Sequence, residues 1–325
     1  MVSAQHKLGH SSIMGLLLNF AGPSIVGLLV NAFYNIVDRI YVGRFVGAEG
    51  LAALTLSFPI MLLQFAFAIL LGSGSAALIS KHWGESDMDK AEKVLGNMFV
   101  GLAAVSILFI GIGIFYTEKI LSLLGGEGLL LTYSVDYLRI ILLGSPFVMV
   151  FALDFTIRGE GSPKFPAIIM VIMSVVNIIL DPIMIGLFHM GVKGAALATV
   201  ISEFIGAFFL IRYYLSDRSI VKLRLKNFIL DKKVITTILT IGFAPFVMDI
   251  AVSFQNIFVN KFLLIYGGEN GVASMGIVFA VNAVCLMVVY GIGDGMSPII
   301  SFNMGAQKDD RIKKALICAM FLIGA

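Results

Sequence analysis

Charged residues are scarce in this 325-residue sequence: Asp, Glu, Lys and Arg make up 13% of it, whereas 59% of the residues are hydrophobic. Soluble domains are roughly 45 to 50% apolar and about 25% charged. A chain of this composition has too few charges to cover the surface of a soluble fold. It is therefore expected to span a membrane several times.

Cysteine and histidine are also rare. Cys285 and Cys318 both stand within apolar stretches, so neither a disulfide nor a metal framework is indicated. The four histidines have no metal-ligand spacing, and no pattern typical of a nucleophile or a nucleotide-binding loop is present. We therefore expect neither enzyme activity nor a cofactor. The net charge of +3 comes from short basic clusters between apolar stretches, so no nucleic-acid partner is expected.

Long apolar stretches fill most of the sequence, and each is long enough to cross a bilayer, which takes about 20 residues. They are predicted to be helices, because backbone in lipid must satisfy its own hydrogen bonds and the period-2 alternation of a barrel is missing. A ninth stretch begins near Ile312. The eight preceding predicted spans are 13–38, 51–80, 97–117, 128–157, 165–188, 194–215, 234–264 and 271–300.

Lys and Arg are distributed unequally between the two sides of these spans. The amino terminus and the loops after spans two, four, six and eight hold seventeen of the 23, and the opposite side holds six. Because Lys and Arg concentrate in cytoplasmic loops, the amino terminus is predicted to be cytoplasmic. We expect a multi-pass protein of the cell (inner) membrane, surrounded by membrane lipids.

An internal repeat divides the chain. A shift of 221 residues pairs 35–95 with 256–316, and fourteen of the sixty-one positions are identical, where about four or five would match by chance. Since six spans separate the copies, both halves start on the same side, as in a parallel repeat. The prediction is an all-α transmembrane bundle of two six-helix lobes, truncated in the ninth of twelve helices. Its parts are an amino-terminal lobe at 1–215, a cytoplasmic linker at 216–233 and a partial carboxy-terminal lobe at 234–325.

Asn177 and Asp181 stand four residues apart in the middle of the apolar span 165–188, on one helix face. An ionised Asp facing lipid would cost about 2.5 to 3.5 kcal/mol, so Asp181 must face other helices or water. Pro182 removes a backbone donor directly after the acid and predicts a loosened helix there. The hypothesis is that Asp181 is a titratable or ion-binding centre.

Other polar residues within the spans could converge with Asp181 on a hydrophilic cavity. The alternative is that they serve as glue between helices, worth about 0.6 kcal/mol each; burying several acids for that purpose alone is expensive. In the first half these residues are Asn31, Asn35, Asp38, Asp154, Thr199 and Glu203.

The second half carries its own polar stripe. Asp249, Ser253 and Asn256 share one face of span seven, which could line a wet cleft, and Asn282 adds to it from span eight. Asp294 stands among glycines, where a structural or gating role and ligand contact are both open. The glycines here and at Gly72 and Gly74 favour close helix approach over phosphate binding.

Four motifs occur in an order that resembles the multidrug and toxic compound extrusion (MATE) family of secondary transporters. They are NIVDRIYVGRFVG (35–47), IRGEGSPK (157–164), NIILDPIMIG (177–186) and GVKGAALAT (191–199).

The resemblance implies two six-helix bundles around a V-shaped cavity that opens alternately to each side. It implies a monomer that expels small, cationic, amphipathic compounds in exchange for H+ or Na+. By position, the coupling site of the family falls on Asp38, Asn177, Asp181 and Thr199, with Asp154 adjoining, where relatives often carry an amide. If sodium is the coupling ion, its ligands would come from Asp38, Asn177 and Asp181.

The main alternative is a flippase for a lipid-linked oligosaccharide, from the same superfamily. Such a protein is expected to present basic residues to a pyrophosphate group, whereas the cavity candidates here are acids and amides. A channel or a membrane scaffold without transport activity is the third interpretation. The charge of the candidates favours export of a cationic compound.

Overall fold

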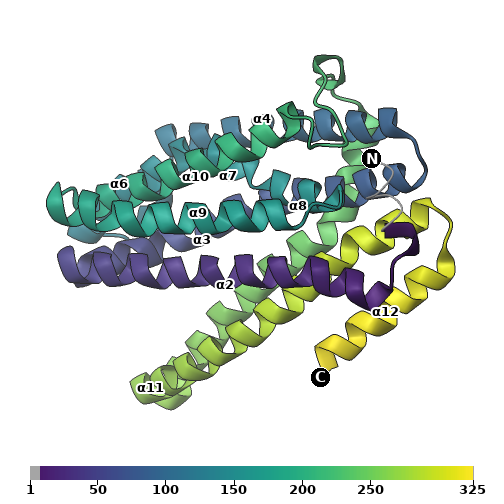
Figure 1. Ribbon diagram of the computed structural model, residues 1–325. Helices are drawn as coiled ribbons and strands as arrows, with labels where there is room; N and C mark the ends of the chain where they lie inside the picture. Colours follow the sequence, from purple (N-terminus) through teal and green to yellow (C-terminus); the bar gives the residue numbers. More distant parts are fainter. Residues whose placement is uncertain (1–7, 325) are drawn as a thin grey trace.

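The computed structural model describes residues 8–324, apart from the side chains of 252–254, 256–258, 260, 261, 263–281 and 283. Nearly all of this part of the chain is helical, and no strand occurs in it (Figure 1). The all-α prediction is confirmed. The helices are α2 (Ile13–Phe45), α3 (Ala48–Gly84), α4 (Met88–Phe115), α5 (Thr117–Leu123), α6 (Gly128–Leu143), α7 (Ser145–Val150), α8 (Ala152–Gly159), α9 (Lys164–Asp181), a π-helix (Pro182–Leu187), α10 (Gly191–Leu215), a 3-10 turn (Leu225–Asn227), α11 (Lys232–Gly305) and α12 (Asp309–Gly324).

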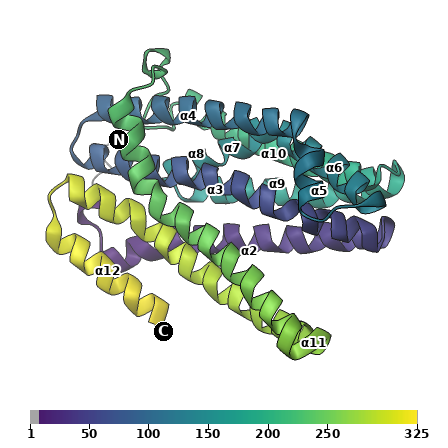
Figure 2. The same ribbon diagram turned by 180° about the vertical axis from the view of Figure 1, so that it is seen from behind.

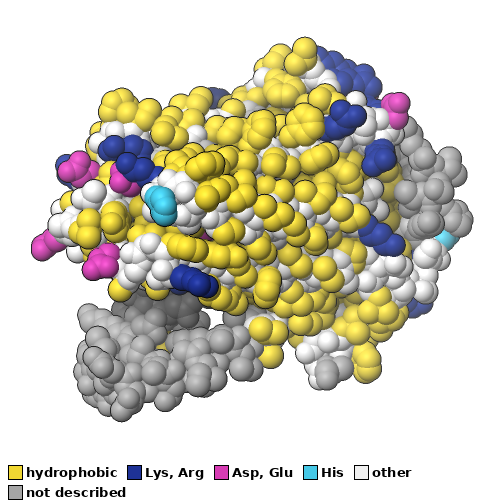
Figure 3. Space-filling view, turned by 60° about the vertical axis from the view of Figure 1, so that its left-hand side comes forward, with side chains coloured by type: hydrophobic (Ala, Val, Ile, Leu, Met, Phe, Trp, Pro, Cys, Tyr) yellow, Lys and Arg dark blue, Asp and Glu magenta, His cyan; other side chains and the backbone are white. Residues whose placement is uncertain are grey.

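Seven helical segments in the described residues are long and apolar enough to cross a membrane, or eight if the bent pair of α6 with Ser145–Gly159 counts as one span. The bend between the two members of that pair is 52°. Figure 3 shows hydrophobic side chains over the middle of one face and charged ones toward its two ends, as a lipid-embedded protein requires. The predicted third span started at 97, whereas α4 begins at Met88, because Asp87 caps its first turn by accepting from the Lys90 amide.

Helix α11 contains two of the predicted spans. Ile238 packs against Gly74 and Phe302 packs against Gly84, so both contacts fall within ten residues of α3. A straight helix would place Ile238 and Phe302 about 96 Å apart, against about 15 Å for the two glycines. The helix therefore doubles back, and its two arms lie side by side in Figures 1 and 2. The two arms correspond to the predicted spans 234–264 and 271–300, although helical backbone is assigned from Lys232 to Gly305.

The repeat is visible in the contacts between the lobes. A Cβ added to Gly295 would lie 2.6 Å from the Ala21 nitrogen, and one added to Gly74 would lie 3.1 Å from the Gly242 nitrogen. The shift of 221 residues relates position 21 to position 242 and position 74 to position 295. Each contact is therefore the repeat equivalent of the other, with the roles of the two lobes exchanged. Ser86 (φ 61°) and Gln307 (φ 56°), which the same shift relates, both adopt the left-handed conformation in their turns. The parallel repeat is thus confirmed in three dimensions.

Glycine allows the two lobes to meet closely at one end of the bundle. A Cβ on Gly242 or Gly305 would come within 1.9 Å of a backbone oxygen of α3, which no side chain can tolerate. The close helix approach predicted for Gly74 and Gly295 is confirmed, because a Cβ there would lie 2.1 Å from the Ile238 oxygen and 2.6 Å from the Ala21 nitrogen. Away from this end the arms of α11 diverge from α2 (Figures 1 and 2). The lobes therefore touch at one end and spread apart toward the other.

The irregular segment 216–231 connects α10 to α11 and is fastened to the first lobe. Glu160, directly after α8, accepts from the Ile220 amide at 2.9 Å and from the Ser219 hydroxyl at 2.9 Å. Burial raises the pKa of Glu160 to about 7, in spite of these donors. At the far end of the segment Asp231 pairs with Lys93 at 2.5 Å, and this bond holds the pKa of Asp231 below its usual value.

Candidate functional site

Asp38 on α2 and Asp181 at the end of α9 form a pair of buried acids. Their exposed fractions are 8% and 0%, and their carboxylates lie within electrostatic range of each other. Both oxygens of Asp181 and one oxygen of Asp38 have no hydrogen-bond partner. A buried carboxylate without a partner is stable only if a proton or a cation neutralises it. The pair is therefore suited to take up and release a positive charge.

The backbone changes its geometry directly after Asp181. Helix α9 ends at this residue and a π-helix runs from Pro182 to Leu187. Proline has no N–H to donate to the preceding turn, and π-helical turns are frequent at functional sites. The loosened helix predicted at Pro182 is confirmed. This local irregularity places the acid at a point where the helix can change its hydrogen bonds.

Asn177 and Thr199 complete the group. The Asn177 amide nitrogen donates to the Thr199 hydroxyl at 3.4 Å, which links α9 to α10. The Asn177 carbonyl oxygen has no partner, and it lies one turn before Asp181 on the same helix. Four of the five residues predicted for ion coupling, Asp38, Asn177, Asp181 and Thr199, therefore come together.

Asp154, the fifth, does not join this group. It forms an ion pair with Arg158 one turn further along α8, and both side chains are buried. The Arg158 guanidinium also donates to Ser24 and to Asp294, each at 3.0 Å. Ser24 precedes Asp38 by fourteen residues on α2, which corresponds to about 21 Å. The prediction that Asp154 adjoins the other acids is wrong, because Asp294 of the second lobe and Arg158 hold it elsewhere.

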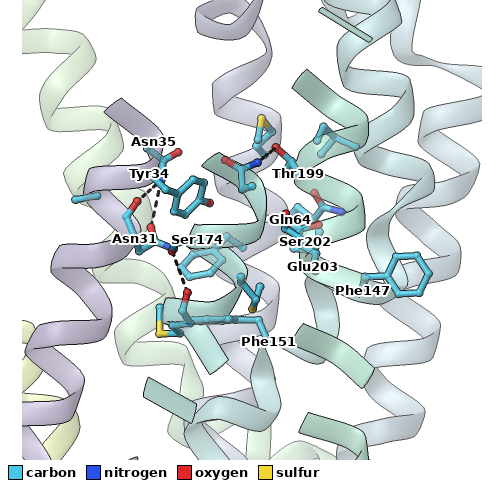
Figure 4. Close-up of a pocket in the computed structure, with 18 of the residues that line it drawn as sticks. Asn31, Tyr34, Asn35, Gln64, Phe147, Phe151, Ser174, Thr199, Ser202 and Glu203 are labelled. Atoms are coloured by element: carbon cyan, nitrogen blue, oxygen red, sulfur yellow. Dashed lines mark hydrogen bonds between the residues drawn. The ribbon is translucent and has the colours of Figure 1, made fainter. Parts of the chain in front are cut away.

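A cavity of about 520 Å³ lies beside the Asp38–Asp181 pair, between α2, α3, α6, α7, α9 and α10. Neither Asp38 nor Asp181 lines it, so both are set back in its wall. The predicted lining residues Asn31, Asn35 and Glu203 do line it, and Figure 4 shows them on facing sides. The polar lining residues are Asn31, Tyr34, Asn35, Arg39, Gln64, Ser174, Asn177, Thr199, Ser202 and Glu203.

The polar stripe predicted for the second half does not contribute to this cavity in the described residues. Asp249 is half-buried on α11, Asn282 is exposed, and neither lines the cavity. Ser253 and Asn256 lie outside the residues whose side chains are described. From α11 only Met287 reaches the cavity, within the described part of that helix.

Several lining residues were missed from the sequence. Gln64 donates to Ser145 at 2.7 Å, beside the bend between α6 and α7. Gln64 is the one amide in the long apolar span 51–80, and on that basis it could have been predicted to line a polar cavity. Arg39 follows Asp38 and lies over the Phe58 ring at 5.8 Å. Phe147 and Phe151 carry no such signal, because most phenylalanines of this chain face lipid or the core.

Known proteins share this architecture. The family model described as MatE matches residues 23–183 and 245–325. The multidrug export protein MepA of Staphylococcus aureus is 30% identical over 315 residues, which cover 97% of this chain and 69% of that protein. The structure of the MATE multidrug transporter DinF-BH aligns with a TM-score of 0.88 and 32% identity, covering 97% of this chain and 71% of that one.

A MATE crystal structure in the straight conformation has a TM-score of 0.92 at 24% identity, over 98% of this chain and 71% of that one. This likeness supports the fold. The family model covers well over half of the residues, and the helical bundle agrees with it. The chain therefore belongs to the MatE family of multi-pass membrane transporters.

Proposed function

We propose that this protein is a secondary active antiporter that exports drug-like, cationic and amphipathic compounds in exchange for protons or sodium. The observation that carries the proposal is the pair of buried, unpartnered acids Asp38 and Asp181 in the wall of the cavity. The names of the relatives, which include a multidrug export protein and a multidrug transporter, support the substrate class.

The cavity has the dimensions of a site for a small organic molecule, which range from about 300 to 1,000 Å³. Its walls combine aromatic rings and methionines with a few amides and hydroxyls. Flexible methionines and flat rings accommodate guests of different shape. Such a lining suits a transporter that accepts many related compounds rather than one metabolite.

Coupling would arise from the charge state of the acids. When Asp38 and Asp181 are both ionised, their repulsion and desolvation favour a conformation that admits water, a proton or a sodium ion. When they are neutralised, α2 and the π-helix after Asp181 can repack against each other. An ion shifts this equilibrium only by its different affinity for the two conformations. Export follows if the guest prefers the ionised conformation.

Alternating access requires one end of the cavity to close while the other opens. The described lobes meet at the end that carries Gly84 and Gly305, where Arg158 also links α2, α8 and α11. The segments 81–93, 158–164, 212–233 and 308–314, which contain the loops after α3, α8, α10 and α11, lie at this end and hold sixteen of the 23 Lys and Arg residues. We therefore assign this end to the cytoplasmic side of the cell (inner) membrane. The amino terminus is then cytoplasmic, and the lobes spread outward. We propose that the transporter works as a monomer, since both lobes belong to one chain.

The charge of the cavity distinguishes export of cations from flipping of a lipid-linked oligosaccharide. Among the described lining residues Arg39 is the only basic one, and it is exposed. A pyrophosphate group would require several cationic donors in the interior. Arg158, the other candidate, is already shared by two acids. The geometry therefore favours the antiporter.

The test is transport in proteoliposomes under an imposed pH gradient or an imposed sodium gradient. We expect the wild-type protein to move a fluorescent organic cation under at least one of the two gradients. Asp38→Asn and Asp181→Asn should reduce that rate at least about tenfold, since the site loses its ionisable groups. The matched control is Asp136→Asn, which removes an acid paired with Lys193 at the surface. Normal transport by both cavity-wall variants would refute the proposal, and whichever gradient drives the wild type identifies the coupling ion.

A further inference from the structure

Glu203 on α10 is the one acidic side chain among the described residues that line the cavity. One of its carboxylate oxygens is shielded from solvent and has no hydrogen-bond partner. In the part of the chain whose side chains are described, none of the ion pairs involves it. Arg39, the basic residue of the lining, is exposed and stacks over Phe58. The cavity therefore contains an acid without a counter-ion.

The surroundings of Glu203 are those of a site for an organic cation. Ser202 and Gln64 lie beside it, and Tyr34 lies across the cavity with Asn31 and Asn35 (Figure 4). Phe151 packs against Phe65 at an interplanar angle of 41°, with ring centroids 5.0 Å apart, and both rings line the same space. Aromatic faces attract cations, and this attraction is stronger where water is excluded.

Glu203 is separate from the two acids assigned to ion coupling. Asp38 and Asp181 are set back in the wall and do not line the cavity, whereas Glu203 does. All three lie within electrostatic range of the Tyr34 ring, so a charge placed at Glu203 acts in the same region. A guest and a coupling ion can therefore bind to different carboxylates and still influence each other.

We infer that Glu203 is the counter-ion for the positive group of the exported compound, which we identify as an organic monocation with aromatic substituents. This inference rests on the proposed function, because it names the group that holds the guest of that same cavity. The carboxylate supplies the charge, and the aromatic and methionine walls contact the apolar substituents. An uncharged molecule of similar shape makes the apolar contacts with the walls but lacks the attraction to the carboxylate.

The experiment compares two ligands of similar shape and different charge. Tetraphenylphosphonium is a permanent monocation, and triphenylphosphine oxide is an uncharged relative in which an oxygen replaces one of the four phenyl groups. Binding of each radiolabelled compound to the purified full chain in nanodiscs is measured by equilibrium dialysis. Glu203→Gln keeps the size of the side chain and removes its charge. It should weaken tetraphenylphosphonium binding at least about tenfold, the loss expected for a charge-assisted contact, and leave triphenylphosphine oxide binding within about twofold.

Glu203→Asp tests whether charge, rather than size, is responsible, and it should retain much of the preference for the cation. Asp136→Asn serves as the surface control, and the thermal unfolding of each variant confirms that it is folded. Equal loss of both ligands in Glu203→Gln, unchanged binding of the cation, or failure of the wild-type protein to bind the cation would each overturn the inference. The proposed function fails differently, through absence of gradient-driven transport in wild-type proteoliposomes.

Discussion

Two groups of acids in the interior of this protein differ in what surrounds them. Asp38 and Asp181 have carboxylate oxygens without a hydrogen-bond partner and take part in none of the ion pairs of the described residues. Asp154, one oxygen of which also lacks a partner, and the partly buried Asp294 share one arginine, Arg158. The first pair lies within the amino-terminal lobe beside the cavity. The second joins the two lobes where they meet. The same chemical group therefore occurs once as an unneutralised charge and once as part of a contact between lobes.

The surroundings of a buried acid therefore indicate whether its role is structural or belongs to transport. Acids that are paired with an arginine keep their charge, because the ion pair and its hydrogen bonds offset much of the desolvation. Acids without a partner can be neutralised only from outside, by a proton, an ion or a guest. The unpartnered acids Asp38, Asp181 and Glu203 are accordingly those for which we propose roles in transport. The paired acids lie where the two lobes meet and are linked through Arg158.

Loss of Arg158 should have the largest effect on stability. Arg158→Gln leaves Asp154 buried without its cation and removes the donor to Asp294. Breaking one partner out of a buried ion pair costs about 3 to 5 kcal/mol. Thermal unfolding can be followed through Trp83, the only tryptophan, whose ring packs on Phe302 of the second lobe at 5.1 Å. We expect a clearly lower melting temperature and an altered Trp83 emission in the variant.

The triple variant Asp154→Asn, Arg158→Gln, Asp294→Asn is the control for that experiment. It removes the orphaned charges together with their partner, so most of the lost stability should return. A single Arg158→Gln variant as stable as the wild type would show that Arg158 does not hold the lobes together. Pairing with Arg158 would then not distinguish Asp154 and Asp294 as acids with a structural role.

Glu160 is an intermediate case, because it is buried and hydrogen-bonded to neutral donors but has no cation. Burial raises its pKa from 4.5 to about 7. Between these two values the folded protein holds more protons on Glu160 than the unfolded chain does, so its contribution to stability falls as the pH rises. The full contribution, about 3 kcal/mol, is present below pH 4.5 and is lost above about pH 7.

Hydrogen exchange at the Ile220 amide, which donates to Glu160, measures this effect directly. Protection, corrected for intrinsic exchange rates, should decrease between pH 5 and pH 8. Glu160→Gln should remove the pH dependence. Glu85→Gln, an acid at the same end of the bundle that is paired with His82, should leave it unchanged. Protection that rises with pH would contradict the raised pKa of Glu160.

Much of the fold could be predicted from the sequence, because each bilayer-crossing helix must be apolar over about 20 residues. The spans, the repeat and the role of the interface glycines followed from such local rules. The two arms of α11 correspond to the predicted spans 234–264 and 271–300, between which Gly267 and Gly268 stand. The start of α4 was missed because the polar residues 88–93 extend the helix beyond its apolar part.

The candidate site was predictable to the extent that it depends on residues of one helix. Asn177 and Asp181 share a face at a spacing of four, and Pro182 disturbs the helix after them. Asp154 was misplaced because its environment depends on Asp294, 140 positions away in the other lobe. A charged pair that forms between lobes leaves no local pattern. The aromatic lining of the cavity is hidden for a similar reason, among many other phenylalanines.

The smallest expected change in stability concerns Asp181, and it completes the comparison with Arg158. Both carboxylate oxygens of Asp181 already lack partners, so Asp181→Asn breaks no hydrogen bond and removes a charge that burial disfavours. The melting temperature should stay the same or rise, by an amount equivalent to at most about 1 kcal/mol, while transport is lost. A decrease as large as that of Arg158→Gln would mean that Asp181 is held by a partner, and the distinction between the two groups of acids would fail.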